Sequence, residues 1–148
     1  MNENAMINLG YYEIKKSMEN YVSSNLGRKK VIEMTPLTDQ RKIERMLNET
    51  EEAMVVLEAL TNPPLYGIQD ITTLIERVKI GGVLNPLELL QVADVIRGMR
   101  LTRNKMVKFE YQAPHIYNYA VSLAELREIE NEIHEAIKGQ NVSSSASK

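Results

Sequence analysis

The sequence has 148 residues, of which 43% are hydrophobic and 26% charged, and its formal net charge is -2. A chain of this length can bury the core of one ordinary domain, and this composition is typical of globular rather than disordered proteins. The small net charge does not favour a partner bound through bulk electrostatics, such as nucleic acid or a membrane surface.

Several classes of protein are excluded by what the sequence lacks. It has no cysteine, so disulfide bonds, thiolate metal sites and cysteine nucleophiles are excluded. The first residues, MNENAMINLGYYEIKK, are acidic and amide-rich where a signal peptide needs an apolar run. The longest unbroken apolar run, from Ala53 to Leu57, is far shorter than the roughly 20 residues of a membrane helix. We therefore expect a cytoplasmic protein with no membrane partner.

The fold class predicted is all-α, a bundle of about five or six amphipathic helices. The composition is rich in residues that lose little rotamer freedom in a helix. The first predicted helix has apolar side chains at spacings of three and four: Tyr11, Ile14, Met18, Tyr21 and Val22. Gly27 interrupts this pattern, and residues 28–34 are predicted as a short second helix that Thr35-Pro36 ends.

The strongest predicted helix follows, with Thr38 or Asp39 as its cap and Asn62-Pro63-Pro64 as its end. An apolar stripe runs along it over six turns: Ile43, Met46, Leu47, Thr50, Met54, Leu57 and Leu60.

The stretch GIQDITTLIERVKIGGVLNPLELLQ, residues 67–91, predicts one helix that stops and another that starts at once. Asp70 stands where an N-cap belongs, and Gly81-Gly82 ends the first helix. Asn85 caps the second helix, Pro86 takes its first position and Glu88 its third. GGVLNP is therefore predicted to be a tight corner between helices and not a phosphate-binding loop.

The remaining chain is predicted to hold two more helices. The first runs from Pro86 to about Phe109, with a buried face of Leu89, Val92, Ile96, Met99 and Met106. Residues 111–119 are expected to form a connection or a short helical turn. The last helix has its apolar positions at Leu123, Leu126, Ile129, Ile133 and Ile137 and is expected to end near Gly139. We predict one core domain over residues 1–139 and a polar tail over residues 140–148.

Five basic residues and no acid lie between residues 97 and 108: Arg97, Arg100, Arg103, Lys105 and Lys108. One interpretation is a solvated helix face, complemented by the acidic helices at residues 39–60 and 123–138. The other is a face that contacts nucleic-acid phosphates or an acidic partner. Arg103 is close to the apolar side of its helix, so it either extends to water or faces a surface outside this chain.

No catalytic or metal-binding motif is found. Gly81-Gly82 lacks the Lys and Ser or Thr of a phosphate-binding loop, and neither histidine has a glutamate three residues before it. Glu130 and His134 are one turn apart, but one such pair is too few ligands for a metal site. We therefore expect no catalytic residue, no metal and no cofactor in this chain. A small helical enzyme for an anionic metabolite would have to use Arg97, Arg100 and Lys108.

Three blocks together resemble the start of the MutS-like ATPases: SSNLGRKKVIEMTP (23–36), GIQDITTLIERVKIGGVLNPLELLQVADVI (67–96) and LAELREIENEI (123–133). They are most similar to the second bacterial MutS branch, which is associated with recombination suppression and ribosome rescue. In that family these blocks belong to the N-terminal part of the helical core, or lever, domain, which joins the DNA-clamping helices to the ATPase.

The resemblance implies a non-catalytic core fragment that transmits the nucleotide state of the ATPase to the nucleic-acid clamp. Its partners would be the rest of its own polypeptide and, through the full-length dimer, DNA or the ribosome. ATP and Mg²⁺ are implied only for the ATPase part, because the Walker motifs are absent here, and so is the Phe-x-Glu mismatch reader. NVSSSAS (141–147) resembles the family's Val-x-Asp-x-Ala-Ser with Ser144 at the Asp position, which suggests that Lys148 is a truncation point. The alternative is a free-standing α-helical protein-interaction module.

Overall fold

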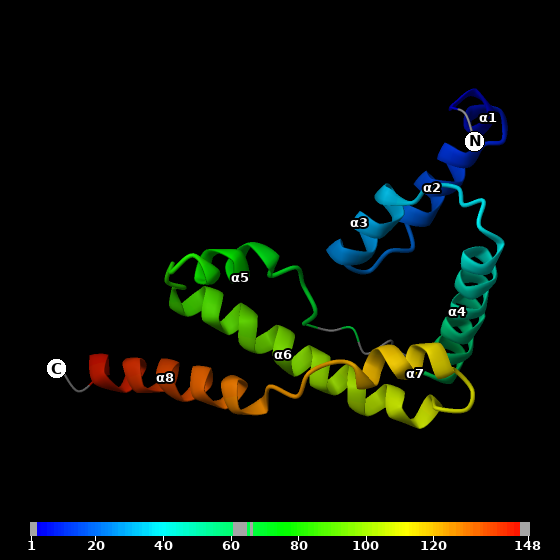
Figure 1. The fold of residues 1–148 in the computed structure, drawn as a ribbon. Coiled ribbons are helices and arrows are strands. Elements are labelled where there is room, and N and C mark those ends of the chain that lie inside the picture. The colour runs from blue at the N-terminus through cyan, green and yellow to red at the C-terminus, as the bar shows by residue number, and fades with distance from the viewer. Residues whose placement is uncertain (1–2, 61–64, 66, 146–148) are drawn as a thin grey trace. The chain divides into compact units, whose positions relative to one another are not determined.

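The computed structural model describes residues 3–60, 65 and 67–145. Over these residues it contains eight α-helices, one 3-10 helix and no strand, which confirms the all-α prediction (Figure 1). The chain folds as two compact units, Met1–Arg45 and Met46–Lys148. No helix of the described residues is long and apolar enough to cross a membrane.

The first unit contains three short helices, α1 (Glu3–Asn8), α2 (Tyr11–Glu19) and α3 (Asn25–Glu33). The helix α1 was not predicted, and α2 ends before the predicted Val22. Likewise, α3 starts ahead of Gly27 instead of after it, because the Ser24 side chain accepts a hydrogen bond from the Gly27 N–H (3.0 Å) and so caps the helix. A Cβ on Gly27 would lie 3.0 Å from the Val22 side chain. This glycine therefore serves close packing at a helix start and does not break the helix.

The helix α4 (Gln40–Ala59) begins in the first unit and continues in the second. Asp39 caps it by accepting a hydrogen bond from the Lys42 N–H (3.2 Å), as predicted. Its buried residues are Glu52 and Val56, which lie outside the apolar stripe. Most of the stripe is exposed, so sequence periodicity identified the helix but not the face that packs. The predicted stop at Asn62-Pro63-Pro64 lies outside the described residues.

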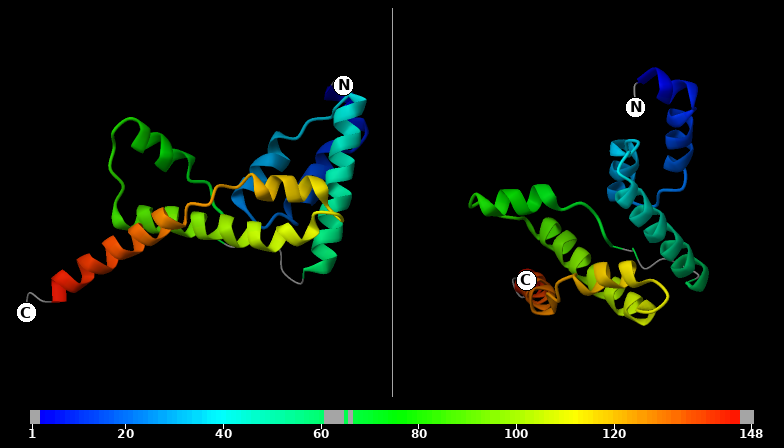
Figure 2. Two further views of the ribbon diagram at one scale, coloured as in Figure 1. Left: turned by 60° about the horizontal axis from the view of Figure 1, so that its bottom comes forward. Right: turned by 45° about the vertical axis from the view of Figure 1, so that its right-hand side comes forward.

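The second unit is built around α6 (Pro86–Met106). The 3-10 helix η1 (Val107–Phe109) and α7 (Pro114–Val121) fold back at the end of α6, and α8 (Arg127–Ser145) lies against its side (Figures 1 and 2). One buried cluster joins α4, α6, η1 and α7: Val56, Met106, Phe109, Ala113 and Ala120. Of the predicted buried face of α6, Ile96 and Met106 are buried, whereas Leu89, Val92 and Met99 are half-buried.

The corner between α5 (Thr72–Lys79) and α6 follows the prediction closely. Gly81 has φ +83°, and the N–H groups of Gly81 and Gly82 bond to the carbonyls of Val78 and Arg77, which is a Schellman ending. A Cβ on Gly82 would lie 2.8 Å from the Arg77 carbonyl oxygen, so this position is glycine because the backbone passes too close. Asn85 and Glu88 form the reciprocal capping box at the start of α6.

Three expectations near the helix ends are corrected. Asp70 accepts from the Thr72 N–H (3.0 Å), but the N-cap position of α5 is Ile71, one residue later than predicted. Residues 111–119, expected as a connection or a short helical turn, are helical from Pro114 onward, and this helix, α7, is longer than expected and continues to Val121. The helix α8 continues through Gly139 to Ser145, because one interior glycine costs only about 1 kcal/mol and does not stop a helix. The domain boundary at residue 139 stays a prediction.

Candidate functional site on the basic helix

The five basic residues of α6 and η1 divide into two groups. Arg97, Lys105 and Lys108 are exposed, whereas Arg100 and Arg103 are half-buried and point to groups of the same chain. We call the first group, Arg97, Lys105 and Lys108, the exposed basic strip. The structure thus does not bring all five cations to one solvent-facing surface.

Arg100 forms a bidentate ion pair with Glu130 of α8. The Arg100 Nε and one terminal nitrogen donate to the two Glu130 carboxylate oxygens at 3.1–3.2 Å. The side chain of Glu130 is only 8% exposed and that of Arg100 29% exposed. A buried carboxylate needs such a partner, because an unpaired buried charge is costly. The pair therefore ties α6 to α8 at one position along both helices.

Arg103 holds the connection that leads from α7 into α8. Its guanidinium donates to the Leu123 carbonyl oxygen (3.1 Å) and lies 3.1 Å from the exposed Glu125 carboxylate. The charge near the apolar side of the helix thus has an acceptor within the chain, and the predicted acidic complement at residues 123–138 supplies partners for both arginines.

The exposed basic strip makes fewer internal contacts. Lys108 lies over the ring of Phe109, with its ammonium 5.1 Å from the ring centroid. Arg97 lines a cavity of about 310 Å³ together with Gly67, Asp94, Gly98 and Leu101. Within the described residues, no hydrogen bond or ion pair joins Arg97 or Lys105 to another side chain. A contact of this strip with nucleic acid or an acidic partner stays a prediction.

Glu52 forms a polar centre that the sequence analysis missed. Its carboxylate accepts hydrogen bonds from the backbone N–H groups of His115 (2.7 Å) and Ile116 (3.1 Å) at the start of α7. The other oxygen lies 2.6 Å from His115 Nδ1. Burial acts to raise the pKa of Glu52, but the His115 imidazole and the two N–H groups outweigh it and lower that pKa below its ordinary value.

The Glu52 arrangement replaces a local helix cap. Ala113 is the N-cap residue of α7 and has no side chain that can accept a hydrogen bond. Pro114 is typical of the first position of a helix. Because the residue before it cannot cap that helix, the sequence indicates only that an acceptor from elsewhere in the chain is needed. Nothing in the sequence shows that this acceptor is Glu52.

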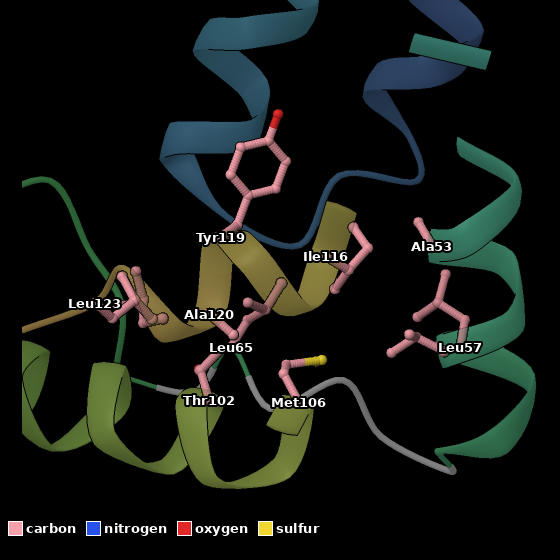
Figure 3. A pocket seen from close by; sticks show the side chains of 11 residues that line it. Ala53, Leu57, Leu65, Thr102, Met106, Ile116, Tyr119, Ala120 and Leu123 are labelled. Carbon is pink, nitrogen blue, oxygen red and sulfur yellow. The ribbon is translucent and has the colours of Figure 1, made fainter. Parts of the chain in front are cut away.

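An apolar pocket of about 410 Å³ opens beside this centre, between α4, α6 and α7 (Figure 3). Leu57, Met106 and Ile116 face the pocket, and Thr102 is one polar residue of its lining. The Tyr119 hydroxyl points away and donates to Glu49 (2.6 Å). A pocket of this size can hold apolar side chains or a small apolar molecule, and the described residues of its lining include no carboxylate, imidazole or thiol.

No metal site is formed by the residues that the structure describes. No group of three or more His, Asp or Glu side chains is placed to hold an ion there. The Glu130 carboxylate, which the sequence put one turn from His134, is engaged by Arg100 instead.

Comparison with known proteins places the chain among larger relatives. No family model matches it. It is 34% identical over 143 residues, 95% of the chain, to "Endonuclease MutS2" of Clostridium beijerinckii. It is 42% identical over 68% of the chain to the protein of the same name in Ruminiclostridium cellulolyticum, and 29% identical over 93% of the chain to that of Bacillus velezensis. The chain belongs to the MutS2 branch of the MutS-like family.

The MutS2 relatives are much longer than this chain. It spans 18% of the length of the Clostridium beijerinckii and Bacillus velezensis proteins and 13% of that of the Ruminiclostridium cellulolyticum protein. The similarity therefore concerns one helical segment of these relatives, and the word endonuclease in their name refers to those proteins.

Proposed function

We propose that this chain is a non-catalytic core segment of a MutS2-type, DNA-associated ATPase. Its role is mechanical: it transmits the nucleotide state between a nucleotide-hydrolysing part and a nucleic-acid clamp, and both of these lie outside these residues. The observation that carries the proposal is the match of nearly the whole chain to less than a fifth of the MutS2 relatives. ATP and Mg²⁺ belong to the remaining part, and DNA or the ribosome is reached through a full-length dimer.

The geometry of the second unit suits such a role. The helices α6 and α8 have 21 and 19 residues, which makes each of them about 30 Å long. The Arg100–Glu130 pair joins them at one point, and α8 then diverges from α6 (Figure 2, left). In this proposal the half-buried Arg100–Glu130 pair couples the first part of α8 to α6, so that a displacement of α6 is passed to α8.

A chimera tests this proposal. The matched segment of the Clostridium beijerinckii relative is replaced by this chain, and ATP hydrolysis is measured with and without DNA. We expect the chimera to retain hydrolysis and its response to DNA. Arg100→Met should reduce that response while leaving hydrolysis without DNA within about twofold, because it breaks the α6–α8 connection and leaves the ATPase part intact.

The matched control is Arg97→Met, which removes an exposed cation of the same helix that forms no ion pair with the residues that the structure describes. It should leave both rates near those of the chimera. Equal effects of the two variants, or hydrolysis of ATP by this chain alone, would contradict the proposal. A stable homodimer of the chain without any response in the chimera would favour the alternative of a free-standing interaction module.

A further inference from the structure

The second half of α4, residues 46–59, is attached to the rest of the second unit through little apolar surface. Of the residues of α4, only Glu52 and Val56 are buried, whereas α6 buries six of its residues. Met54 and Leu57, which flank Val56 closely in sequence, are 56% and 52% exposed. A helix that buries few apolar side chains detaches at a low cost in free energy, because little apolar surface returns to water.

Polar groups supply much of the attachment. The Glu52 carboxylate accepts the N–H groups of His115 and Ile116 and contacts the His115 imidazole, and the Tyr119 hydroxyl donates to Glu49. We call Glu49 and Glu52 of α4, with His115, Ile116 and Tyr119 of α7, the α4–α7 latch. These bonds join one helix to the other, so α4 and α7 each keep their internal backbone hydrogen bonds when the latch opens.

Apolar packing beneath the latch is incomplete. The described residues leave an apolar pocket of about 410 Å³ between α4, α6 and α7, and Leu57 and Met106 face it from different helices (Figure 3). A close-packed core leaves few spaces of this size between its side chains. The pocket therefore reduces the dispersion contacts that hold α4, and the polar latch carries a larger share of the attachment.

We propose that α4 is a detachable helix, which moves away from α7 as one piece when the α4–α7 latch opens, while α6, α7 and α8 stay folded. Opening leaves the N–H groups of His115 and Ile116, the first two of α7, to water. Because α4 begins in the first unit and continues in the second, a displacement of its first residues acts on the latch.

Native-state hydrogen exchange, measured by NMR on the chain itself, distinguishes this opening from unfolding. The amides of His115 and Ile116 bond to Glu52 across the latch, whereas Ala120 is a buried residue inside α7. We expect the first two amides to be protected about equally, and about tenfold less than the Ala120 amide or lower still. Equal protection of all three would show that α4 leaves only when the unit unfolds, and the proposal would be wrong.

Glu52→Gln tests whether the carboxylate holds the latch closed, because it keeps the shape of the side chain and removes its charge. Exchange at His115 and Ile116 should become about tenfold faster or more, while that of Ala120 stays within about twofold. The matched control, Glu51→Gln, changes an exposed neighbour and should leave all three rates unaltered. No acceleration in Glu52→Gln, or an equal acceleration at all three amides, would overturn the proposal.

Spin-label distances give a second measurement. Because the chain has no cysteine, labelled cysteines at the exposed positions Glu58 and Lys105 report on α4 against α6, and those at Lys105 and Glu132 on α6 against α8. In Glu52→Gln the first distance distribution should broaden toward longer distances, and the second should match that of the parent. An unchanged first distribution, or broadening of both, would contradict a detachable α4. Both measurements use residues 1–148 alone, so their outcome is separate from that of the chimera.

Discussion

Replacing Glu52 by alanine should destabilise the second unit more than any change at an exposed glutamate of α4. The Glu52 side chain is 11% exposed. Its carboxylate accepts hydrogen bonds from two backbone N–H groups and contacts one imidazole nitrogen. Hydrogen bonds to a charged group contribute about 1.5–3 kcal/mol, and loss of a helix cap costs about 1 kcal/mol. Because these contributions overlap, we expect a loss of about 2–4 kcal/mol.

The lower half of that range is favoured by the surroundings of Glu52. A cavity of about 280 Å³ lies beside it, lined by Glu51, Gln112 and His115 among others. Water entering this cavity can solvate the N–H groups that the alanine variant leaves without an acceptor, which reduces the penalty. We therefore set the expected value at about 2–3 kcal/mol, and the test is urea unfolding followed by helical circular dichroism.

The control is Glu51→Ala, which removes an exposed carboxylate one position away on the same helix. It should change the free energy of unfolding by no more than about 0.5 kcal/mol. If Glu52→Ala and Glu51→Ala gave the same small effect, the carboxylate would not be capping α7 in solution.

The other predictions concern pH, the corner, the ion pair and the basic strip. Because the pKa of Glu52 is lowered on folding from about 4.5, its charge stabilises the fold fully above that unfolded pKa, and the stability advantage over Glu52→Gln should be lost as pH falls from that value through the lower folded pKa. Gly82→Ala should cost about 2 kcal/mol in urea unfolding, at least as much as Gly81→Ala, because its Cβ would meet the Arg77 carbonyl at 2.8 Å; a variant as stable as the parent would refute this close approach. Glu130→Ala should cost about 2 kcal/mol by the same assay, less than for a fully buried pair because the guanidinium left behind can reach water. We expect this chain to bind DNA only weakly, through few phosphate contacts, and replacing the whole exposed basic strip by alanine should reduce that binding and its salt dependence in fluorescence anisotropy; tight, salt-resistant binding would contradict this expectation.

Local patterns predicted the parts of this structure whose cause is local. The α5–α6 corner is the clearest case, since glycine at a left-handed position and an Asn–Glu capping box act within a few residues. Predictions from local patterns were wrong where two local signals competed. Gly27 was interpreted as a break, but the Ser24 cap three residues earlier starts the helix first.

The candidate site could be predicted only in outline. The run of basic residues on α6 and the acidic composition of residues 123–138 indicated that charges would pair, but not which of them. Arg100 and Arg103 proved to be the paired ones, because α8 and the segment leading into it lie on that side of α6. Helical spacing indicates which side chains share a face, but it does not indicate which face another helix will cover.

By itself, the sequence determined the all-α class, the helix starts and stops around residues 67–91 and the family to which the chain belongs. The class and these helix ends depend on residue types at short spacing, where backbone conformation and hydrogen bonding act directly, whereas the family follows from similarity to its members along nearly the whole chain. Only the tertiary structure decided that Glu52, not the apolar stripe of α4, is buried and that its carboxylate caps α7 across 63 residues of sequence. Such pairing follows from which surfaces meet when the helices pack, and no pattern of neighbouring residues contains that information.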